Sequence, residues 1–290
     1  MSVSLTKTQI AHYRREGYVV VPSIFNSDEM RRVDQVIREF TQKWLASEDY
    51  TKVMELEPEP VDGEQVVRRI HNPFDQHEVF RKIATDPRVL DRIESLIGPD
   101  IGLHHSKINM KLARVGSVVE WHQDLAYFPH TNDDLVTTLI YLDEATEENG
   151  CLQVIPRHHL QYFDHANPDG EFAGMITEDL ASGRFGMPVS LPAPAGSVIF
   201  MHCILPHSSL PNRSESHRRT LIYEYRAADS FPIYFTQRVA ALEYTTHHLQ
   251  GERARFARFA GPDPLIPRFT QVKSLYQLQA EAKARRQETD

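Results

Sequence analysis

Trp121-His122-Gln123-Asp124 is the stretch from which the fold and the chemistry of this chain can be inferred. Side chains two positions apart in a β-strand point to the same face, so a strand here would direct His122 and Asp124 into one pocket. An imidazole beside a carboxylate supplies two ligands of the 2-His-1-carboxylate set, which binds non-haem Fe(II) and leaves coordination positions open. We therefore expect a third ligand from a strand that is distant in sequence.

The residues around this stretch favour a fold made mainly of β-strands. From Ile101 to Tyr225, short apolar and β-branched segments alternate with turn signals such as Glu148-Asn149-Gly150. We expect strands at 103–112, 117–122, 135–142, 151–155, 197–203 and 217–225. A run of strands after a run of helices predicts an antiparallel double sheet with flanking helices, that is, a jelly roll or double-stranded β-helix.

The chain is predicted to form a single domain, with a helical part over 1–100, a jelly-roll core over 101–232 and a helical extension over 233–290. Asn26 or Ser27 can cap a helix whose apolar stripe includes Val33 and Ile37. Further helices are expected at 6–15, at 76–84, after Pro87 and in a charged tail at 271–290. An acidic, proline-bearing loop is expected at 48–68, and a functional loop or lid at 160–190.

Composition excludes several classes of protein. The chain has 290 residues and a formal net charge of −8, which argues against a nucleic-acid binder because phosphate binding requires a basic surface. No apolar run approaches a membrane span, and no secretory signal begins the chain. Cys151 and Cys203 lie in apolar runs, so we expect buried thiols in a reducing compartment, the cytoplasm. Nothing in the sequence specifies an oligomeric state.

The third metal ligand is expected in Phe200 to Ser209, which contains both His202 and His207. Pro206 bends the chain between them, so periodicity alone does not select one. The pairs 104–105, 158–159 and 247–248 are weaker candidates, because adjacent strand residues point to opposite faces. His207 is favoured by its context: two serines follow it, and an arginine pair begins the next strand. Iron of this type needs an electron-donating co-substrate such as 2-oxoglutarate, whose far carboxylate suits the planar fork of an arginine.

These motifs together resemble the phytanoyl-CoA dioxygenase family of Fe(II)/2-oxoglutarate-dependent oxygenases. The resemblance rests on Trp121 to Leu125, on Asn149 to Leu152, on His207-Ser208-Ser209-x-x-Asn212 and on Arg218 eleven residues after His207, and it extends from Tyr13 to Pro232. It implies a double-stranded β-helix, as expected above. It also implies that His122, Asp124 and His207 bind Fe(II), and that Arg218 pairs with the C5 carboxylate of 2-oxoglutarate with Ser209 hydrogen-bonding beside it.

Further pocket residues are expected with an alternative for each. Thr137 fits a second hydroxyl contact to 2-oxoglutarate. Arg69 matches a basic position that the family can use for the co-substrate, although a solvated charge is the alternative. Lys107 and Asn109 share one face of a strand, which could point into the pocket or out to water. Tyr127 and Phe128 follow the metal carboxylate and are expected to line the substrate site, with core packing as the alternative.

The expected reaction is hydroxylation of an unactivated C–H bond of a small molecule, with O2 consumed and succinate and CO2 released. Within the resemblance, Asp124 favours hydroxylation, because halogenating relatives replace this carboxylate with a small residue. Hydroxylation of an acyl-CoA thioester is an alternative that would require a basic rim, and no dense basic cluster is present. Two further alternatives are a zinc-dependent hydrolase, which would not require Arg218, and a non-catalytic jelly-roll binding protein.

Overall fold

The computed structural model describes residues 3–61, 63–180, 183–234, 237–269, 271 and 273–287. The helices are α1 (Lys7–Glu16), α2 (Ser27–Leu45), η1 (Tyr50–Lys52), α3 (Pro73–Gln76), α4 (Glu78–Ala84), α5 (Pro87–Ile97), η2 (Asp124–Ala126), α6 (Gln237–Leu242), the π-helix η4 (Glu243–His247) and α7 (Leu275–Gln287). The strands are β1 (Tyr18–Val21), β2 (Met54–Leu56), β3 (Val67–His71), β4 (Ile101–Lys111), β5 (Val119–His122), β6 (Leu135–Tyr141), β7 (Leu152–Val154), β8 (Val189–Ser190), β9 (Val198–His202), β10 (His207–Ser209), β11 (Arg218–Ala227) and β12 (His248–Gln250).

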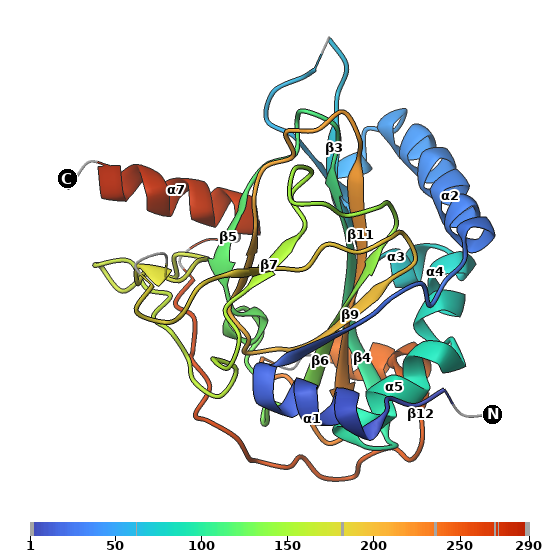
Figure 1. Ribbon diagram of the computed structural model, residues 1–290, viewed down its shortest axis with the longest axis vertical. Coiled ribbons are helices and arrows are strands. Elements are labelled where there is room, and N and C mark those ends of the chain that lie inside the picture. Colours follow the sequence, from blue (N-terminus) through green and yellow to red (C-terminus); the bar gives the residue numbers. More distant parts are fainter. Residues whose placement is uncertain are drawn as a thin grey trace.

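Two antiparallel sheets face each other and form the predicted jelly roll. The larger sheet has the order β1-β9-β6-β11-β4-β3-β2, with β12 also paired to β4, and the smaller sheet has the order β5-β10-β7-β8. Figure 1 shows helices α2 to α5 against one side of the larger sheet, while β5 and β7 lie on its other side. The site described below lies between the two sheets.

Alternation along the central strands explains this layering. On β11, Leu221 and Tyr223 join the core beneath the helices, whereas Ile222 packs with residues of the smaller sheet. The helix stripe that contains Val33 and Ile37 is buried in the first of these cores, as predicted. Asn26 caps α2 through a capping box with Glu29, which satisfies free N–H groups at the helix start.

The strands at the six expected places are confirmed, with ends that differ by one or two residues. The prediction of a loop at 48–68 was wrong, because this region contains η1, β2 and the first residues of β3. Strand β2 pairs only with β3, so its conformation depends on a partner that a local pattern does not reveal. Strand β10 was also missed, because Pro206 precedes its three residues.

The expected lid and tail are described in part. Residues 160–180 and 183–190 are mostly loop with buried apolar side chains, including Phe163 and Ile176. The tail contains α7, while 181–182 of the lid and 270, 272 and 288–290 of the tail lie outside the described residues. Within the described part of the chain, no helix combines the length and the apolar character that crossing a bilayer would require.

Candidate metal centre

Two neighbouring strands of the smaller sheet bring the predicted metal ligands together. His122 on β5 and His207 on β10 are directly opposed residues of an antiparallel pair, and their ring centroids are 4.1 Å apart. Strand β5 ends at His122, but Gln123 remains extended, with φ −122° and ψ 127°. The alternation of side chains therefore continues to Asp124, which begins η2 and points to the same side as His122.

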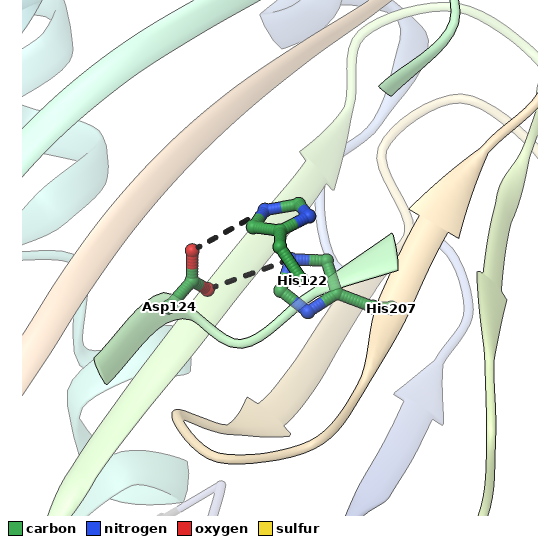
Figure 2. A group of neighbouring side chains, drawn as sticks. All are labelled: His122, Asp124 and His207. Carbon is green, nitrogen blue, oxygen red and sulfur yellow. Dashed lines mark ion pairs between the residues drawn. The ribbon is translucent and has the colours of Figure 1, made fainter. Parts of the chain in front are cut away.

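The three side chains converge on one point, as Figure 2 shows. The Nε2 atom of His122 lies 3.8 Å from Oδ1 of Asp124, and Nε2 of His207 lies 3.7 Å from Oδ2 of the same carboxylate. One potential ligand atom from each residue lies within 4.8 Å of the others. Two imidazoles and one carboxylate on one side of an ion leave its other positions open, which is the arrangement of non-haem Fe(II) oxygenases.

Hydrogen bonds set which nitrogen of each imidazole faces this point. Nδ1 of His122 lies 2.8 Å from the carbonyl oxygen of Glu120, and Nδ1 of His207 lies 2.9 Å from that of Leu205. A carbonyl only accepts, so each Nδ1 carries the hydrogen and each Nε2 presents a lone pair. Burial lowers the pKa of both histidines, and for His122 the nearby His207 adds to the effect. Both rings are therefore neutral, as metal binding requires.

Asp124 is held in its ionised form by the groups around it. Burial opposes ionisation, but Lys107, the two histidines and a hydrogen bond from Thr137 lower the pKa of Asp124 below its usual value. Nζ of Lys107 lies 3.7 Å from Oδ1 of Asp124. A neutral imidazole pair with an ionised carboxylate is the donor set expected for a divalent metal.

Thr137 connects Asp124 to a second buried carboxyl group, Glu224. Its Oγ1 lies 2.8 Å from Oδ2 of Asp124 and 2.6 Å from Oε2 of Glu224. Burial and the charge of Asp124 raise the pKa of Glu224 to about 8. A protonated Glu224 thus donates to Thr137, and the one hydroxyl hydrogen of Thr137 goes to Asp124. The contact of Thr137 with 2-oxoglutarate stays a prediction, and its hydroxyl hydrogen is directed to Asp124 in this structure.

The three potential ligands line a small cavity of about 40 Å³. Its other lining residues come from both sheets and from the C-terminal segment: Arg69, Lys107, Asn109, Val119, Thr137, Leu139, Leu152, Ser208, Ser209, Arg218, Thr220, Ile222 and Leu275. Lys107, Asn109, Ser209, Arg69 and Arg218 were all expected at the pocket, and all of them line it. The side chains of Lys107 and Asn109 therefore point into the pocket, which was one of the two alternatives for this strand face.

Arg218 is a buried cation in the same cavity. Its Nε donates to the carbonyl oxygen of Gly150 at 2.9 Å, and one terminal nitrogen lies 3.3 Å from Oγ1 of Thr220. Gly150 has φ 78°, and a Cβ there would overlap the carbonyl oxygen of Leu210. No carboxylate in the described part of the chain pairs with Arg218. A buried cation without a counter-charge favours an anionic ligand.

The sequence profile of the family named phytanoyl-CoA dioxygenase matches residues 13–220. The chain belongs to the phytanoyl-CoA dioxygenase family. It is 31% identical over 234 residues to a probable alpha-ketoglutarate-dependent hypophosphite dioxygenase of Stutzerimonas stutzeri, a match that covers 78% of this chain and 80% of the relative. It is 29% identical to an L-proline trans-4-hydroxylase of Streptomyces griseoviridis, covering 76% and 86% of the two chains.

Solved structures agree on the fold. EctD from S. alaskensis with bound iron superposes with a TM-score of 0.70 at 22% identity, covering 90% of this chain and 89% of EctD. The non-haem alpha-ketoglutarate-dependent carbocyclase SnoK superposes with a TM-score of 0.64, covering 88% and 96% of the two chains. The family, the relatives and the His–Asp–His group all indicate the same activity. The chain is an Fe(II)- and 2-oxoglutarate-dependent dioxygenase of the hydroxylase type, with O2 as the second co-substrate.

In this family member, the structure distinguishes His207 from His202 and Arg218 from Arg219, which the sequence left as alternatives. His202 lies outside the ligand group, with its Nε2 3.8 Å from Asp133 and its ring near Tyr13 and His159. Arg219 pairs with Asp143 and Asp34 at the opposite face of β11. Strand alternation therefore leaves His207 and Arg218 at the cavity.

Tyr127 and Phe128 do not line the cavity of this dioxygenase. The Tyr127 hydroxyl donates to the carbonyl of Gly174, and its ring lies edge-on to His122 at 5.8 Å. Phe128 packs against His104 and His105, at ring separations of 4.8 and 5.1 Å. The substrate-facing role of both residues stays a prediction, and the structure places only the ring of Tyr127 against a potential metal ligand, His122.

The sequence analysis did not identify Glu224 or the C-terminal residue Leu275 as part of the site. A signal for Glu224 existed, because it is six residues after Arg218 and an even spacing on a regular strand places both on one face. The structure confirms the regular strand from Arg218 to Ala227. No comparable signal exists for Leu275, which reaches the cavity only through the path of the C-terminal chain.

Proposed function

We propose that His122, Asp124 and His207 hold Fe(II) and that Arg218 binds the C5 carboxylate of 2-oxoglutarate. The observation that carries this assignment is the buried, uncompensated guanidinium of Arg218 in the same cavity as a complete facial donor set. A dicarboxylate can satisfy both ends of such a cavity. Ser209 lines it beside Arg218, and we assign its hydroxyl to the same carboxylate.

Bound Fe(II) supplies the redox chemistry that couples oxidation of 2-oxoglutarate to succinate and CO2 with insertion of an oxygen atom into a C–H bond of the substrate. The chain itself positions the reactants. Lys107 and the hydrogen-bonded pair of Arg69 and Asn109, whose Nε and Oδ1 are 2.9 Å apart, provide further polar contacts for the co-substrate. The hydrogen bond from Thr137 to Oδ2 fixes the orientation of the Asp124 carboxylate. Burial of the whole set keeps bulk water away.

The substrate class that we propose is a small polar metabolite. The relatives named above include an enzyme for hypophosphite and an enzyme for L-proline, and the cavity is small and lined by charged side chains. An acyl-CoA thioester is the second candidate, because bovine peroxisomal phytanoyl-CoA dioxygenase is 25% identical over 239 residues. The excess of acidic residues disfavours it, since its phosphates require a basic rim.

A substrate screen tests the proposed function. The protein is loaded with Fe(II) under anaerobic conditions, then exposed to O2 and 2-oxoglutarate with panels of amino acids, small organic acids, phosphorus oxyanions and acyl-CoA esters. Substrate-dependent succinate release from one small polar compound is the expected result, and Asp124→Ala is the matched inactive control. Release only with acyl-CoA esters would select the second candidate, and no 2-oxoglutarate-dependent O2 uptake with any panel would contradict the function.

We also propose a reducing compartment, the cytoplasm, for this dioxygenase. Cys151 and Cys203 are both buried free thiols. Burial raises the pKa of each thiol, which keeps both in the unreactive protonated form.

A further inference from the structure

The C-terminal helix α7 begins at the cavity. Figure 1 shows it beside β5, on the side of the molecule away from α2 to α5. Its first residue, Leu275, lines the same cavity as the metal-ligand group and Arg218. A segment that the sequence predicts only as a charged tail is therefore part of the wall of the site.

Tyr276, the next residue, stacks on two arginines of β3. Its ring centroid is 4.2 Å from Cζ of Arg68 and 4.9 Å from Cζ of Arg69. Arg69 lines the cavity and donates to Asn109, another lining residue. A cation held over an aromatic face gains about 0.5–2 kcal/mol, more where water is excluded. The ring of Tyr276 therefore restrains the side chain of Arg69 at the cavity.

The body of α7 is attached mainly by polar contacts. Oε1 of Gln279 accepts from the backbone N–H of Glu120 at 3.1 Å, and its Nε2 donates to the carbonyl oxygen of Gly174 at 2.8 Å. Arg285 pairs with Asp169 and Glu171 at 2.5 and 3.0 Å. Half-exposed ion pairs of this kind contribute little to stability, and the buried apolar cluster at this helix is small, with Ala282 packed against Ala173 and Met175.

The size of the cavity also favours movement of α7. A volume of about 40 Å³ holds only a few water molecules, whereas a five-carbon dicarboxylate together with a substrate needs considerably more space. Most of the other lining residues belong to strands that are hydrogen-bonded on both sides. Leu275, which lines the cavity, and Tyr276, which stacks on the lining residue Arg69, belong to a peripheral helix that can move with least disruption of the two sheets.

We propose that α7 is a strap that opens to admit 2-oxoglutarate and closes over it, and that Tyr276 is a positioning residue that holds Arg69 against the bound co-substrate. This inference rests on the proposed function. Closure by Leu275 and Tyr276 would exclude water from the loaded site. The aromatic ring, rather than the hydroxyl, makes the contact with Arg69, so phenylalanine should replace Tyr276 without loss.

The test compares wild type, Tyr276→Ala and Tyr276→Phe in two assays without turnover. In the first, 2-oxoglutarate is titrated into the anaerobic Fe(II) protein and followed by the visible absorption of the complex. We expect the Kd to rise about 3- to 30-fold in Tyr276→Ala, as loss of one stacking contact predicts, and to stay unchanged in Tyr276→Phe. In the second, trypsin cleavage near Lys283 is timed with and without Fe(II) and 2-oxoglutarate. Bound co-substrate should protect this site in wild type and Tyr276→Phe but not in Tyr276→Ala.

The possible results distinguish failure of the strap proposal from failure of the proposed function. Equal Kd and equal protection in wild type and Tyr276→Ala would overturn the strap, and so would an equal loss in Tyr276→Phe and Tyr276→Ala. Tyr234→Ala, which removes an exposed tyrosine elsewhere, is the matched control and should behave as wild type. Failure of the wild-type Fe(II) protein to bind 2-oxoglutarate would overturn the proposed function, and the strap with it.

Discussion

The two faces of the larger sheet use alternate residues of the same strands for different purposes. On β11, Leu221 and Tyr223 point to the helices and are completely buried in the apolar core. Arg218 and Glu224, on the other face, point to the smaller sheet and are equally inaccessible to solvent. Burial is therefore the same on both faces, while the chemical character of the buried groups is opposite.

The two faces also differ in their hydrogen bonding. The hydroxyls of Tyr223 and Tyr225 donate to the carbonyls of Phe80 and Ala84, at 2.6 and 2.8 Å, so the polar atoms of these two helix-side residues of β11 are satisfied. On the cavity side, Oε1 of Glu224 has no hydrogen-bond partner and lies 3.6 Å from Nζ of Lys107, and Arg218 has no counter-charge among the described residues. The tyrosine hydroxyls on the helix side find their partners within the folded chain. On the cavity side, we expect bound ligands to provide the missing partners.

The largest effect is expected when a ligand on the cavity side is removed. His207→Ala should abolish Fe(II) binding and turnover, because it removes one of three protein ligands and leaves an incomplete donor set. His202→Ala is the matched control, since His202 is a nearby buried histidine outside the ligand group, and it should retain stoichiometric iron. Iron content after anaerobic reconstitution measures both. Normal iron content in His207→Ala would contradict the ligand assignment.

The next effect concerns the buried cation. Arg218→Ala should weaken 2-oxoglutarate binding by about 2–5 kcal/mol, which is the usual loss when one partner of a buried charge pair is truncated, and iron should remain bound. Arg219→Ala changes the neighbouring arginine, which pairs with Asp143 and Asp34 on the opposite face, and its Kd should match wild type. Titration of the anaerobic Fe(II) protein distinguishes the two. Equal Kd values in both variants would reverse the assignment of the faces.

A substitution on the helix side of the sheet should affect stability alone. Leu221→Ala should lower the free energy of unfolding by about 2–5 kcal/mol, because it opens a cavity in a fully buried core. The Kd for 2-oxoglutarate should remain within twofold of wild type at a temperature where the variant is folded. Equilibrium urea denaturation and the same titration check this. A strong loss of co-substrate affinity would show that the two faces are coupled.

The last effect, and the smallest over any single pH unit, is a pH dependence of the metal-free protein. Glu224 has a pKa of about 8 in the folded state against a usual value of 4.5, so between these values the folded protein holds a proton that the unfolded chain has lost. Stability therefore falls as pH rises through this window, by up to about 1.4 kcal/mol per pH unit. Glu224→Gln mimics the protonated form and should lack this component. Parallel stability–pH curves for wild type and Glu224→Gln would contradict the assignment.

Much of the fold and of the metal centre could be predicted because the relevant signals are local. Alternation of apolar residues marks β6 and β11, and the same alternation places His122 and Asp124 on one side. Motif resemblance then added His207 and Arg218. Strand β10 and the choice between His202 and His207 could not be obtained from periodicity, because Pro206 interrupts the pattern between them.

The residue types and their spacing predicted a two-histidine, one-carboxylate donor set, a guanidinium suited to a dicarboxylate, and the family, since these depend on which side chains occur at which spacing. Only the tertiary structure shows that Thr137 joins Asp124 to Glu224 and that Leu275 lines the cavity while Tyr276 stacks on Arg69. The physical reason is that neighbouring residues alone determine which face of a strand each side chain occupies. The docking of α7 depends instead on Gln279, Arg285 and their partners, which meet only after the sheets have formed.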